Sequence, residues 1–264
     1  MYEIWVEEVA DLGQVPGPEI FWMSRFGEWL PLKIYLLLIQ GQGRTILVNT
    51  GPPLDYVEHM NDVWREELGA PTHMSVSPEQ HIEAVLARHG LSCQSVDTVV
   101  LTPLQAYADG NVDKFPHAQI CISRRGWIDL FAPRFFDARR HMGVPDRLLQ
   151  YLVFKAWPER RVRLLEDEEE IAPGVRSIWV GTHHRSSLAV LVTTARGVVA
   201  YSDAVFYYEN LERDHPLGIQ ESMEECRIAY ARLRRDADIV VSPYDPSNTL
   251  RFPGGAVVLA PGES

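Results

Sequence analysis

The stretch VVLTPLQAYADGN, Val99 to Asn111, decides how this sequence is interpreted. Its first residues are β-branched or aliphatic, which predicts a buried strand that ends at Thr102. Loops at such strand ends are where α/β folds place their binding and catalytic residues. This loop, however, offers a proline, a glutamine, a tyrosine and an alanine, which supply few groups for metal binding or catalysis.

The chain has 264 residues, of which 46% are hydrophobic and 23% are charged, as in an ordinary globular protein. Its length suffices for one domain with a large core. We therefore expect a single domain over 1–264, with an N-terminal extension over about 1–33 and a short C-terminal tail over about 254–264. The net charge of −11 disfavours nucleic acid and anionic membranes as partners. The acidic run Glu166–Glu170 is predicted to be a solvated turn or helix start.

The three cysteines, Cys93, Cys121 and Cys226, are scattered and form no CxxC pair. This spacing argues against a disulfide framework and against a thiolate zinc site. The first residues lack the basic-then-apolar pattern of a signal peptide, and the longest apolar run, Ile34–Ile39, is too short to cross a bilayer. We expect a reduced, cytoplasmic protein.

Short β-rich runs bounded by Gly and Pro alternate with helical patterns along the chain. The predicted strands are Tyr2–Val9, Ile34–Gln40, Thr45–Asn49, Thr98–Thr102, Gln119–Ser123, Val175–Val180, Ala189–Thr194, Val198–Ser202 and Ile239–Ser242. The predicted helices are Pro78–His89, with Ser77 as N-cap and Gly90 as stop, Glu221–Arg235, and Trp127–Tyr151. Strand pairs followed by helices predict a sandwich of sheets with helices on both sides.

Four strand ends carry polar residues in a fixed order. They are ILVNTGPP (Ile46–Pro53), VVLTPLQAYADGN, VGTHHRSSLAVLV (Val180–Val192) with VVAYSDAVFYYENL (Val198–Leu211), and IVVSPYDP (Ile239–Pro246). In this order and spacing they resemble the metallo-β-lactamase superfamily, and within it the branch that includes the N-acyl homoserine lactonases. The resemblance covers about residues 34–250. It implies an α/β fold, an αββα sandwich of two mixed β-sheets flanked by helices.

The superfamily holds two metal ions with five histidines and two aspartates. By resemblance, two of these seven positions are retained, as His183 and Asp203. The other five are substituted, and they fall on Pro103, Gln105, Tyr107, Ala108 and Tyr244. Catalytic zinc takes about three protein ligands. We therefore expect no cofactor, and a single weakly held metal at His183 and Asp203 stays open as an alternative.

Two further family positions are changed as well. The aspartate that supports the loop at the end of the ILVDTG strand is Asn49 here. The tyrosine or histidine that holds the substrate oxygen in lactonases of this branch falls on Phe206, which leaves Tyr207 as its substitute.

Two functions follow from this pattern. The first is a non-catalytic or repurposed subunit that acts in a homo-oligomer, or in a hetero-oligomer with a metal-binding relative. Aromatic residues favour the segment Trp127–Phe136 and the tryptophans Trp5, Trp22 and Trp29 as its interface. Core packing is the alternative for these aromatics.

The second function is a metal-independent hydrolase of a small ester or lactone-like substrate. In it Asp203 would orient His183 as a general base in the old metal pocket. Pocket candidates are His184, Arg185, Gln105, Tyr107 and Tyr244, with Arg185 as a clamp for a carboxylate or phosphate. No G-x-S-x-G nucleophile motif occurs in the sequence, and nothing in it names the small-molecule ligand.

Overall fold

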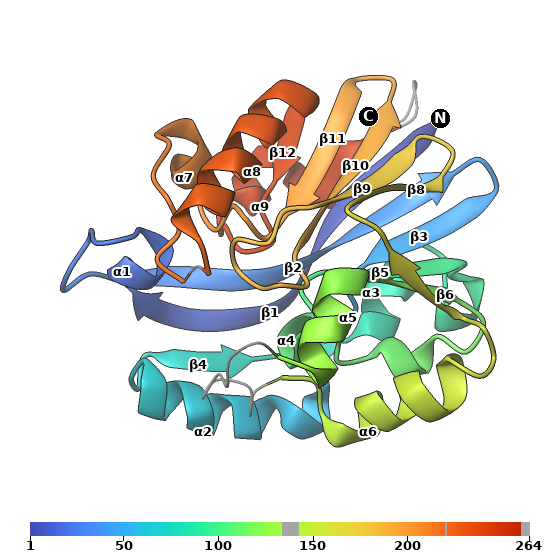
Figure 1. Ribbon diagram of the computed structural model, residues 1–264, viewed down its shortest axis with the longest axis horizontal. Coiled ribbons are helices and arrows are strands. Elements are labelled where there is room, and N and C mark those ends of the chain that lie inside the picture. The colour runs from blue at the N-terminus through green and yellow to red at the C-terminus, as the bar shows by residue number, and fades with distance from the viewer. Residues whose placement is uncertain (134–142, 220, 260–264) are drawn as a thin grey trace.

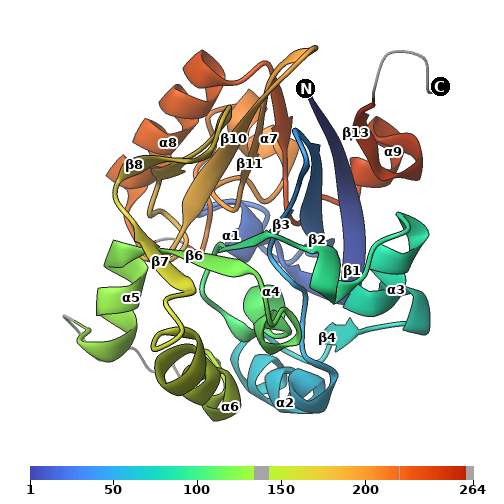
Figure 2. The same ribbon diagram turned by 90° about the vertical axis from the view of Figure 1, so that its right-hand side faces the viewer.

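The computed structural model describes residues 1–133, 143–219 and 221–259. They form two β-sheets that pack face to face with helices outside them (Figures 1 and 2). The fold class predicted from the sequence, an αββα sandwich of two mixed sheets, is confirmed.

The larger sheet has eight strands in the order β13-β1-β2-β3-β5-β6-β7, with β4 paired to β1. Its strands are β1 (Tyr2–Pro16), β2 (Trp29–Gly41), β3 (Arg44–Val48), β4 (Thr72–Ser75), β5 (Thr98–Leu101), β6 (Gln119–Ser123), β7 (Val162–Leu165) and β13 (Ala256–Val258). β3, β5, β6 and β7 run parallel, whereas β1 pairs antiparallel with its neighbours. The parallel half directs the ends of β3 and β5 to one edge of the sheet.

The smaller sheet has five strands in the order β12-β11-β10-β9-β8. They are β8 (Glu168–Ala172), β9 (Val175–Trp179), β10 (Leu188–Thr194), β11 (Gly197–Ser202) and β12 (Ile239–Val241). β10 and β11 form the predicted hairpin, and β12 adds to β11 in parallel. The ends of β9, β11 and β12 therefore lie close to the ends of β3 and β5.

Helices cover both outer faces of the sandwich. They are α1 (Gly17–Ile20), α2 (Val57–Glu67), α3 (Ile82–Arg88), α4 (Ala106–Asp109), α5 (Arg124–Phe131), α6 (Asp146–Gln150), α7 (Tyr208–Glu212), α8 (Met223–Asp236) and α9 (Asn248–Arg251), with a π-helix at Tyr151–Ala156 and 3-10 turns at Leu54–Tyr56, Pro78–Gln80, Cys93–Ser95, Val112–Lys114 and Pro253–Gly255. Figure 2 shows α8 outside β10 and β11, and α2 to α4 on the opposite side. In the described parts of the chain, no helix is long and apolar enough to cross a membrane.

The run Ile34–Ile39 is apolar throughout because β2 is buried on both faces. Ile34, Leu36 and Leu38 pack into the core under the helices. Tyr35, Leu37 and Ile39 face the second core, between the two sheets. A strand with both faces covered loses the alternation of apolar and polar residues that marks a half-exposed strand.

Both ends of the domain differ from the sequence prediction. Residues 1–33, expected to be an extension, supply β1, α1 and the start of β2, and β1 pairs with three other strands. Residues 256–258, within the expected tail, form β13 and pair with Ile4 and Trp5. The alternation of apolar residues along β1 is interrupted by two register shifts. A search for a simple period of two residues therefore does not detect the whole 15-residue strand.

Three local predictions are corrected by the structure. The acidic run Glu166–Glu170 is solvent-exposed at four of its five residues, as predicted, but only its first two residues connect β7 to β8, since Glu168–Ala172 forms β8. The helix Pro78–His89 is broken at His81, whose extended backbone separates a 3-10 turn from α3. The helix Trp127–Tyr151 is divided into α5 and α6, and its residues Phe135 and Phe136 lie outside the described part.

Candidate functional site

Asn49 ties the ends of β3 and β5 together. Its side-chain amide donates to the Thr102 carbonyl oxygen at 2.6 Å, and its side-chain oxygen accepts from the Thr102 amide at 2.8 Å. The Thr102 hydroxyl oxygen in turn accepts from the Leu188 amide at 2.8 Å, which joins the larger sheet to β10. An amide serves here because one side chain must both donate and accept, whereas an ionised aspartate only accepts.

Asn111 closes the loop that follows β5. Its side-chain amide lies 2.9–3.1 Å from the carbonyl oxygens of Thr50, Gly51 and Pro52. Gly110 is needed beside it, since an added Cβ would collide with the Pro53 ring. These bonds hold α4, and with it Tyr107, over the strand ends.

The loop between β9 and β10 carries His183, His184 and Arg185. The His184 amide donates to the Ser187 hydroxyl at 3.1 Å, which makes a tight turn. Arg185 is held by ion pairs with Glu221 and Glu225, and its guanidinium lies 5.0 Å from the ring centre of Trp179.

Arg185 is therefore an anchor of this loop, and its role as a free anion clamp is a prediction that the geometry does not favour. Arg125 lies over the same Trp179 ring at 4.1 Å, so one indole contacts two guanidiniums.

Asp203, at the end of β11, is fully buried. Its Oδ2 accepts from the Ser187 hydroxyl at 2.6 Å, and its Oδ1 has no hydrogen-bond partner among the described residues. Burial raises the pKa of Asp203 from an ordinary value of 3.8 to about 7. The direct hydrogen-bond partner of this carboxyl group is thus Ser187, and not His183 as an orienting Asp–His pair requires.

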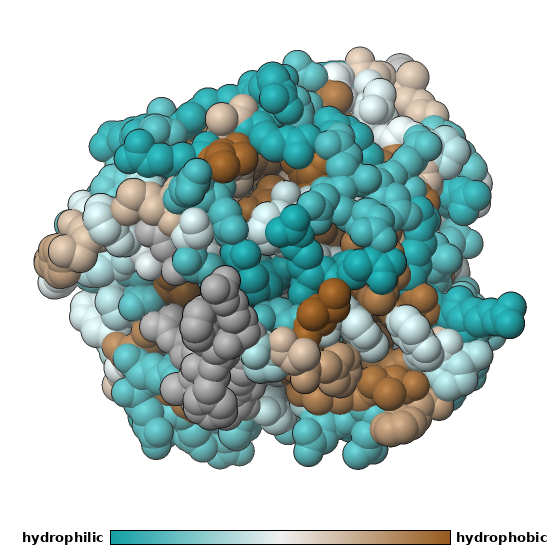
Figure 3. Space-filling view, viewed as in Figure 1, coloured by the Kyte–Doolittle hydropathy of each residue, from teal (hydrophilic) through white to brown (hydrophobic). Residues whose placement is uncertain are grey.

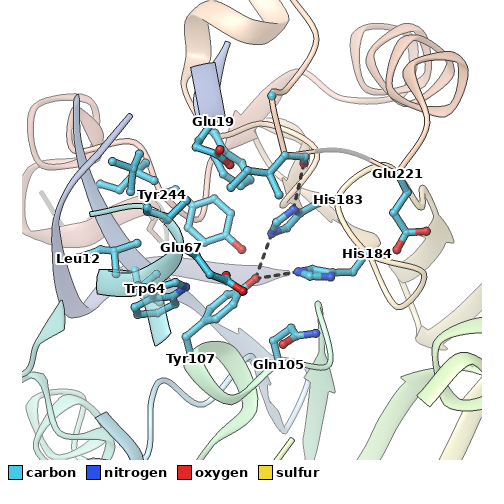
Figure 4. Close-up of a pocket in the computed structure, with 17 residues that line it drawn as sticks. Leu12, Glu19, Trp64, Glu67, Gln105, Tyr107, His183, His184, Glu221 and Tyr244 are labelled. Carbon is cyan, nitrogen blue, oxygen red and sulfur yellow. Dashed lines mark hydrogen bonds between the residues drawn. The ribbon is translucent and has the colours of Figure 1, made fainter. Parts of the chain in front are cut away.

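The phenol of Tyr107 lies between the two histidines (Figure 4). Its hydroxyl oxygen is 3.1 Å from Nε2 of His183 and 3.2 Å from Nε2 of His184. The other ring nitrogen of His183, Nδ1, is 3.2 Å from the Ile219 carbonyl oxygen.

The donors and acceptors of this network can be assigned in order. A carbonyl oxygen only accepts, so His183 donates from Nδ1, and in its neutral form it presents a lone pair at Nε2. With His183 in that form the Tyr107 hydroxyl donates to its Nε2, and the Tyr107 oxygen can then accept from His184 when His184 carries its proton on Nε2. The lone pair of His183 that would bind a metal or a proton is therefore engaged by a phenol.

Tyr244, at the end of β12, completes this side of the site. Its ring lies 4.6 Å from Phe206 and 6.3 Å from His183, measured between ring centres. Burial raises the pKa of both Tyr107 and Tyr244 well above that of a free phenol. Both side chains are therefore neutral phenols near neutral pH.

These polar groups form one end of a cavity of about 420 Å³. The rest of its lining comes largely from the N-terminal strands and α2. The described lining residues are Leu12, Val15, Glu19, Leu32, Ile34, Trp64, Glu67, Leu68, Gln105, Tyr107, His183, His184, Phe206, Gly218, Ile219, Glu221 and Tyr244. Figure 4 shows the two histidines and Tyr107 converging on it from opposite sides.

The structure brings together most of the predicted pocket candidates. Gln105, Tyr107, His183, His184 and Tyr244 line the same cavity. Arg185 instead lines a second cavity, of about 520 Å³, which shares Gln105, His184 and Glu221 with the first.

Tyr207, the predicted substitute for the substrate-holding residue, turns away from the cavity. Its hydroxyl donates to the Pro31 carbonyl oxygen at 2.6 Å. Phe206 stands in the cavity wall in its place and offers no hydrogen bond.

The sequence analysis missed the apolar wall of the cavity. Leu12 and Val15 come from β1, and Leu32 and Ile34 from β2. Trp64 comes from α2, a helix that the sequence analysis did not predict. Its apolar residues Met60, Val63 and Trp64, spaced three to four apart, were the available signal.

The donor set of the site does not fit a dinuclear metal centre. Pro103 and Ala108 have no side-chain donor atom, and the Gln105 amide is a weak ligand for zinc. Tyr107 and Tyr244 keep their protons. Among residues 1–133, 143–219 and 221–259, no group of three or more His, Cys, Asp or Glu side chains is arranged to hold a metal ion.

No protein-family model matches the sequence. Among curated proteins, an N-acyl homoserine lactonase from Bacillus sp is 22% identical over 220 residues, which cover 81% of this chain and 79% of the relative.

Several solved structures share the fold. An N-acyl homoserine lactone hydrolase with the product N-hexanoyl-L-homoserine at its catalytic metal centre has a TM-score of 0.76 at 15% identity, over 97% of this chain and 98% of the other. A variant of B. thuringiensis AiiA with N-decanoyl-L-homoserine at its active site also has a TM-score of 0.76, at 16% identity and the same coverage. The dizinc quorum-quenching lactonase AidC has a TM-score of 0.65 at 14% identity, over 99% and 92% of the two chains.

These relatives and the strand-end motifs agree on one architecture. The chain has the metallo-β-lactamase fold, and its predicted resemblance to the N-acyl homoserine lactonase-like branch of that superfamily is confirmed.

Proposed function

We propose that this hydrolase-like protein has lost its metal site and is repurposed to bind a small amphiphilic molecule without hydrolysing it. The observation that carries the proposal is the Tyr107 hydroxyl, 3.1 and 3.2 Å from Nε2 of His183 and His184. A phenol at this place gives both imidazoles a hydrogen-bonding partner.

The same contact argues against surviving catalysis. A general base needs a free lone pair within reach of the proton it takes. The Nε2 lone pair of His183 accepts from Tyr107, and Asp203 is bonded to Ser187. No Ser, Thr, Cys or Lys side chain is among the described residues that line the cavity, so the hydroxyl, thiol and amine nucleophiles of acyl transfer are missing from that lining.

The lining of the cavity suits a ligand with an apolar chain and a polar head. Leu12, Val15, Leu32, Ile34 and Leu68 form an apolar wall. The polar part of the lining presents the hydrogen-bonding groups of Gln105, His184 and Tyr107, together with the carboxyl groups of Glu19, Glu67 and Glu221. Small-molecule sites commonly combine a mainly apolar lining with a few placed polar groups.

The relatives indicate which molecules to try first. N-Hexanoyl-L-homoserine and N-decanoyl-L-homoserine are bound at the sites of two of the solved structures that share the fold. Each joins an acyl chain to a polar head. We propose an acylated small molecule of this kind as the ligand.

Calorimetry with N-decanoyl-L-homoserine and with its lactone, in the presence of a chelator, tests the proposal. We expect saturable binding and no lactone opening. Leu68→Gln should weaken binding at least tenfold, because it places an amide in the apolar wall. Leu250→Gln, at a residue 83% exposed on α9, is the matched control and should bind as the wild type does.

Two results would contradict the proposal. Near-stoichiometric zinc or iron in the purified protein would show that the site still holds metal. Lactone or ester hydrolysis that survives the chelator and is abolished by His183→Ala or Asp203→Asn would establish the metal-independent hydrolase instead.

A further inference from the structure

The helix α5 and the π-helix Tyr151–Ala156 expose several large apolar side chains on one surface. Ile128 is 55% exposed, Phe131 51%, Phe154 77% and Trp157 47%. Together with Trp127 they are called the aromatic patch below. Single exposed apolar residues are common, but a contiguous group of this size is not.

Ring contacts join the members of the aromatic patch. Trp127 stacks on Trp157 with ring centres 5.6 Å apart and planes 11° apart. The ring centres of Trp127 and Phe131 are 4.9 Å apart in an edge-on arrangement. Phe154 lies one helical turn before Trp157. Figure 3 shows apolar surface gathered over the α5 and α6 side of the molecule, to the right of the grey atoms. The patch is therefore one surface built from two segments.

The exposed apolar area of the aromatic patch is about half of what one partner buries in an ordinary protein–protein interface. With large apolar side chains burying about 150–250 Å² each, the exposed half of four of them amounts to roughly 400 Å². An interface of ordinary size buries about 800 Å² on each partner, with an apolar centre and a polar rim. The patch supplies the apolar centre of such an interface.

The charges that flank the aromatic patch suit a second copy of the same chain. Lys155 and Arg160 are exposed beside it, and Arg124 pairs with Glu166 at its other side. Both signs are present, whereas the whole chain carries a net charge of −11. Two copies that meet here avoid most of the repulsion that their remaining surfaces would produce. A strongly basic partner would need a strongly acidic flank on this chain, and Lys155, Arg160 and the Arg124–Glu166 pair do not form one.

We propose that the aromatic patch is the contact of a homodimer, in which two copies are related by a two-fold axis and place the same residues opposite one another. This inference does not depend on ligand binding in the cavity. It assigns the interface to α5 and the π-helix, and not to the exposed Trp22, in the turn after α1, or Trp29, at the start of β2.

Sedimentation velocity from about 1 to 200 μM tests the proposal on the full-length chain. We expect a reversible monomer–dimer equilibrium in the wild type. Phe154→Ser should raise the dissociation constant at least tenfold, since this side chain is exposed and contributes little to the core. Leu250→Ser removes an equally exposed apolar residue elsewhere and should leave the equilibrium unchanged.

A cross-linking experiment tests whether the two copies are related by a two-fold axis at the aromatic patch. The three native cysteines are buried, so a Phe154→Cys variant carries one accessible thiol. In a two-fold dimer centred on the patch, a short bis-maleimide should join two copies through this position, and a Leu250→Cys control should stay uncoupled. A monomer at every concentration, or a dimer that survives Phe154→Ser and Phe131→Ser, would overturn the proposal.

Discussion

Two strand-end loops face each other across the cavity and differ in what they keep. The loop after β5 keeps its backbone framework, with Asn49 bonded to Thr102 and Asn111 bonded to three carbonyl groups, but its donor positions hold Pro, Gln, Tyr and Ala. The loop after β9 keeps a histidine at its donor position and adds a second, His184. Fold and chemistry are thus carried by different residues of the same loops.

The bonds that fix the loops run through backbone groups and side chains that never face a ligand. The side chains that face the cavity can change without loss of these bonds. Tyr107 illustrates this, because it fills the space between two imidazoles while its helix is held by Asn111 and Gly110.

The largest effect should follow from restoring the donors. A variant with Pro103→His, Gln105→His, Tyr107→Asp, Ala108→His and Tyr244→His places histidine or carboxylate at all five substituted positions. If these are the metal positions, we expect at least one tightly bound zinc per chain by elemental analysis, against far less in the wild type. A variant that folds by circular dichroism yet takes up no zinc would contradict the assignment.

Stability should depend on pH through Asp203. The folded chain holds this proton more tightly, since burial raises the pKa from 3.8 to about 7. The contribution of the protonated Asp203 to the free energy of unfolding is therefore complete below about pH 4, decreases as the pH rises towards 7, and changes no further above pH 7. Its upper bound is about 4 kcal/mol. Urea unfolding of the wild type and of Asp203→Asn from pH 4.5 to 8.5 measures this slope, which the variant should reduce.

Asp109 should act in the same direction and provides a comparison on the other loop. It is buried with neither carboxyl oxygen bonded among the described residues, and burial raises its pKa well above the ordinary value. Asp109→Asn should also flatten the loss of stability with rising pH. An unchanged pH profile in both variants would show that neither carboxyl group keeps its proton.

The framework should be more sensitive than the donor positions. Asn111→Ala removes three hydrogen bonds to buried carbonyl groups and should lower the free energy of unfolding by about 2–3 kcal/mol. Gln105→Ala, a matched change at a donor position of the same loop, should stay within about 0.5 kcal/mol. Chemical denaturation of both variants measures the two losses of free energy of unfolding. Equal losses would show that the framework residues are no more sensitive than the donor positions.

An effect smaller than that of Asn111→Ala is expected for Tyr107→Phe. This change removes the hydroxyl between His183 and His184 and should cost about 1–2 kcal/mol, because two ring nitrogens lose a partner. A gain in stability would mean that the phenol strains the site instead of satisfying it.

The order of strand-end motifs predicted the fold well because turns need particular residues. Gly110, Asn111 and Ser187 make contacts that few other residues can make, so they are readable in one sequence. The same residues located the site at the strand ends. The position of Tyr107 in the loop predicted that it would lie in the pocket with His183.

The hydrogen-bond pattern inside the pocket could not be predicted from the sequence. A sequence shows that Asp203 and His183 are near each other in the fold, but not that Ser187 takes the carboxyl group and Tyr107 the imidazole. Those choices depend on side-chain rotamers and on distances of a few tenths of an ångström. The apolar wall from β1 and β2 was also missed, because strands with two register shifts and two buried faces show no simple period.

The pairing of β1 with β13 has a consequence for how the chain reaches its native state. Ile4 is aligned with Val258, so strands about 250 residues apart must meet to finish one edge of the larger sheet. During synthesis the part of the outer edge of β1 at Ile4 and Trp5 stays without this neighbour until β13 has been made, whereas β4 covers the part at Asp11 and Gly13 much earlier. An open strand edge is a template for pairing with other chains, so this short segment of β1 is exposed to such pairing until β13 is made.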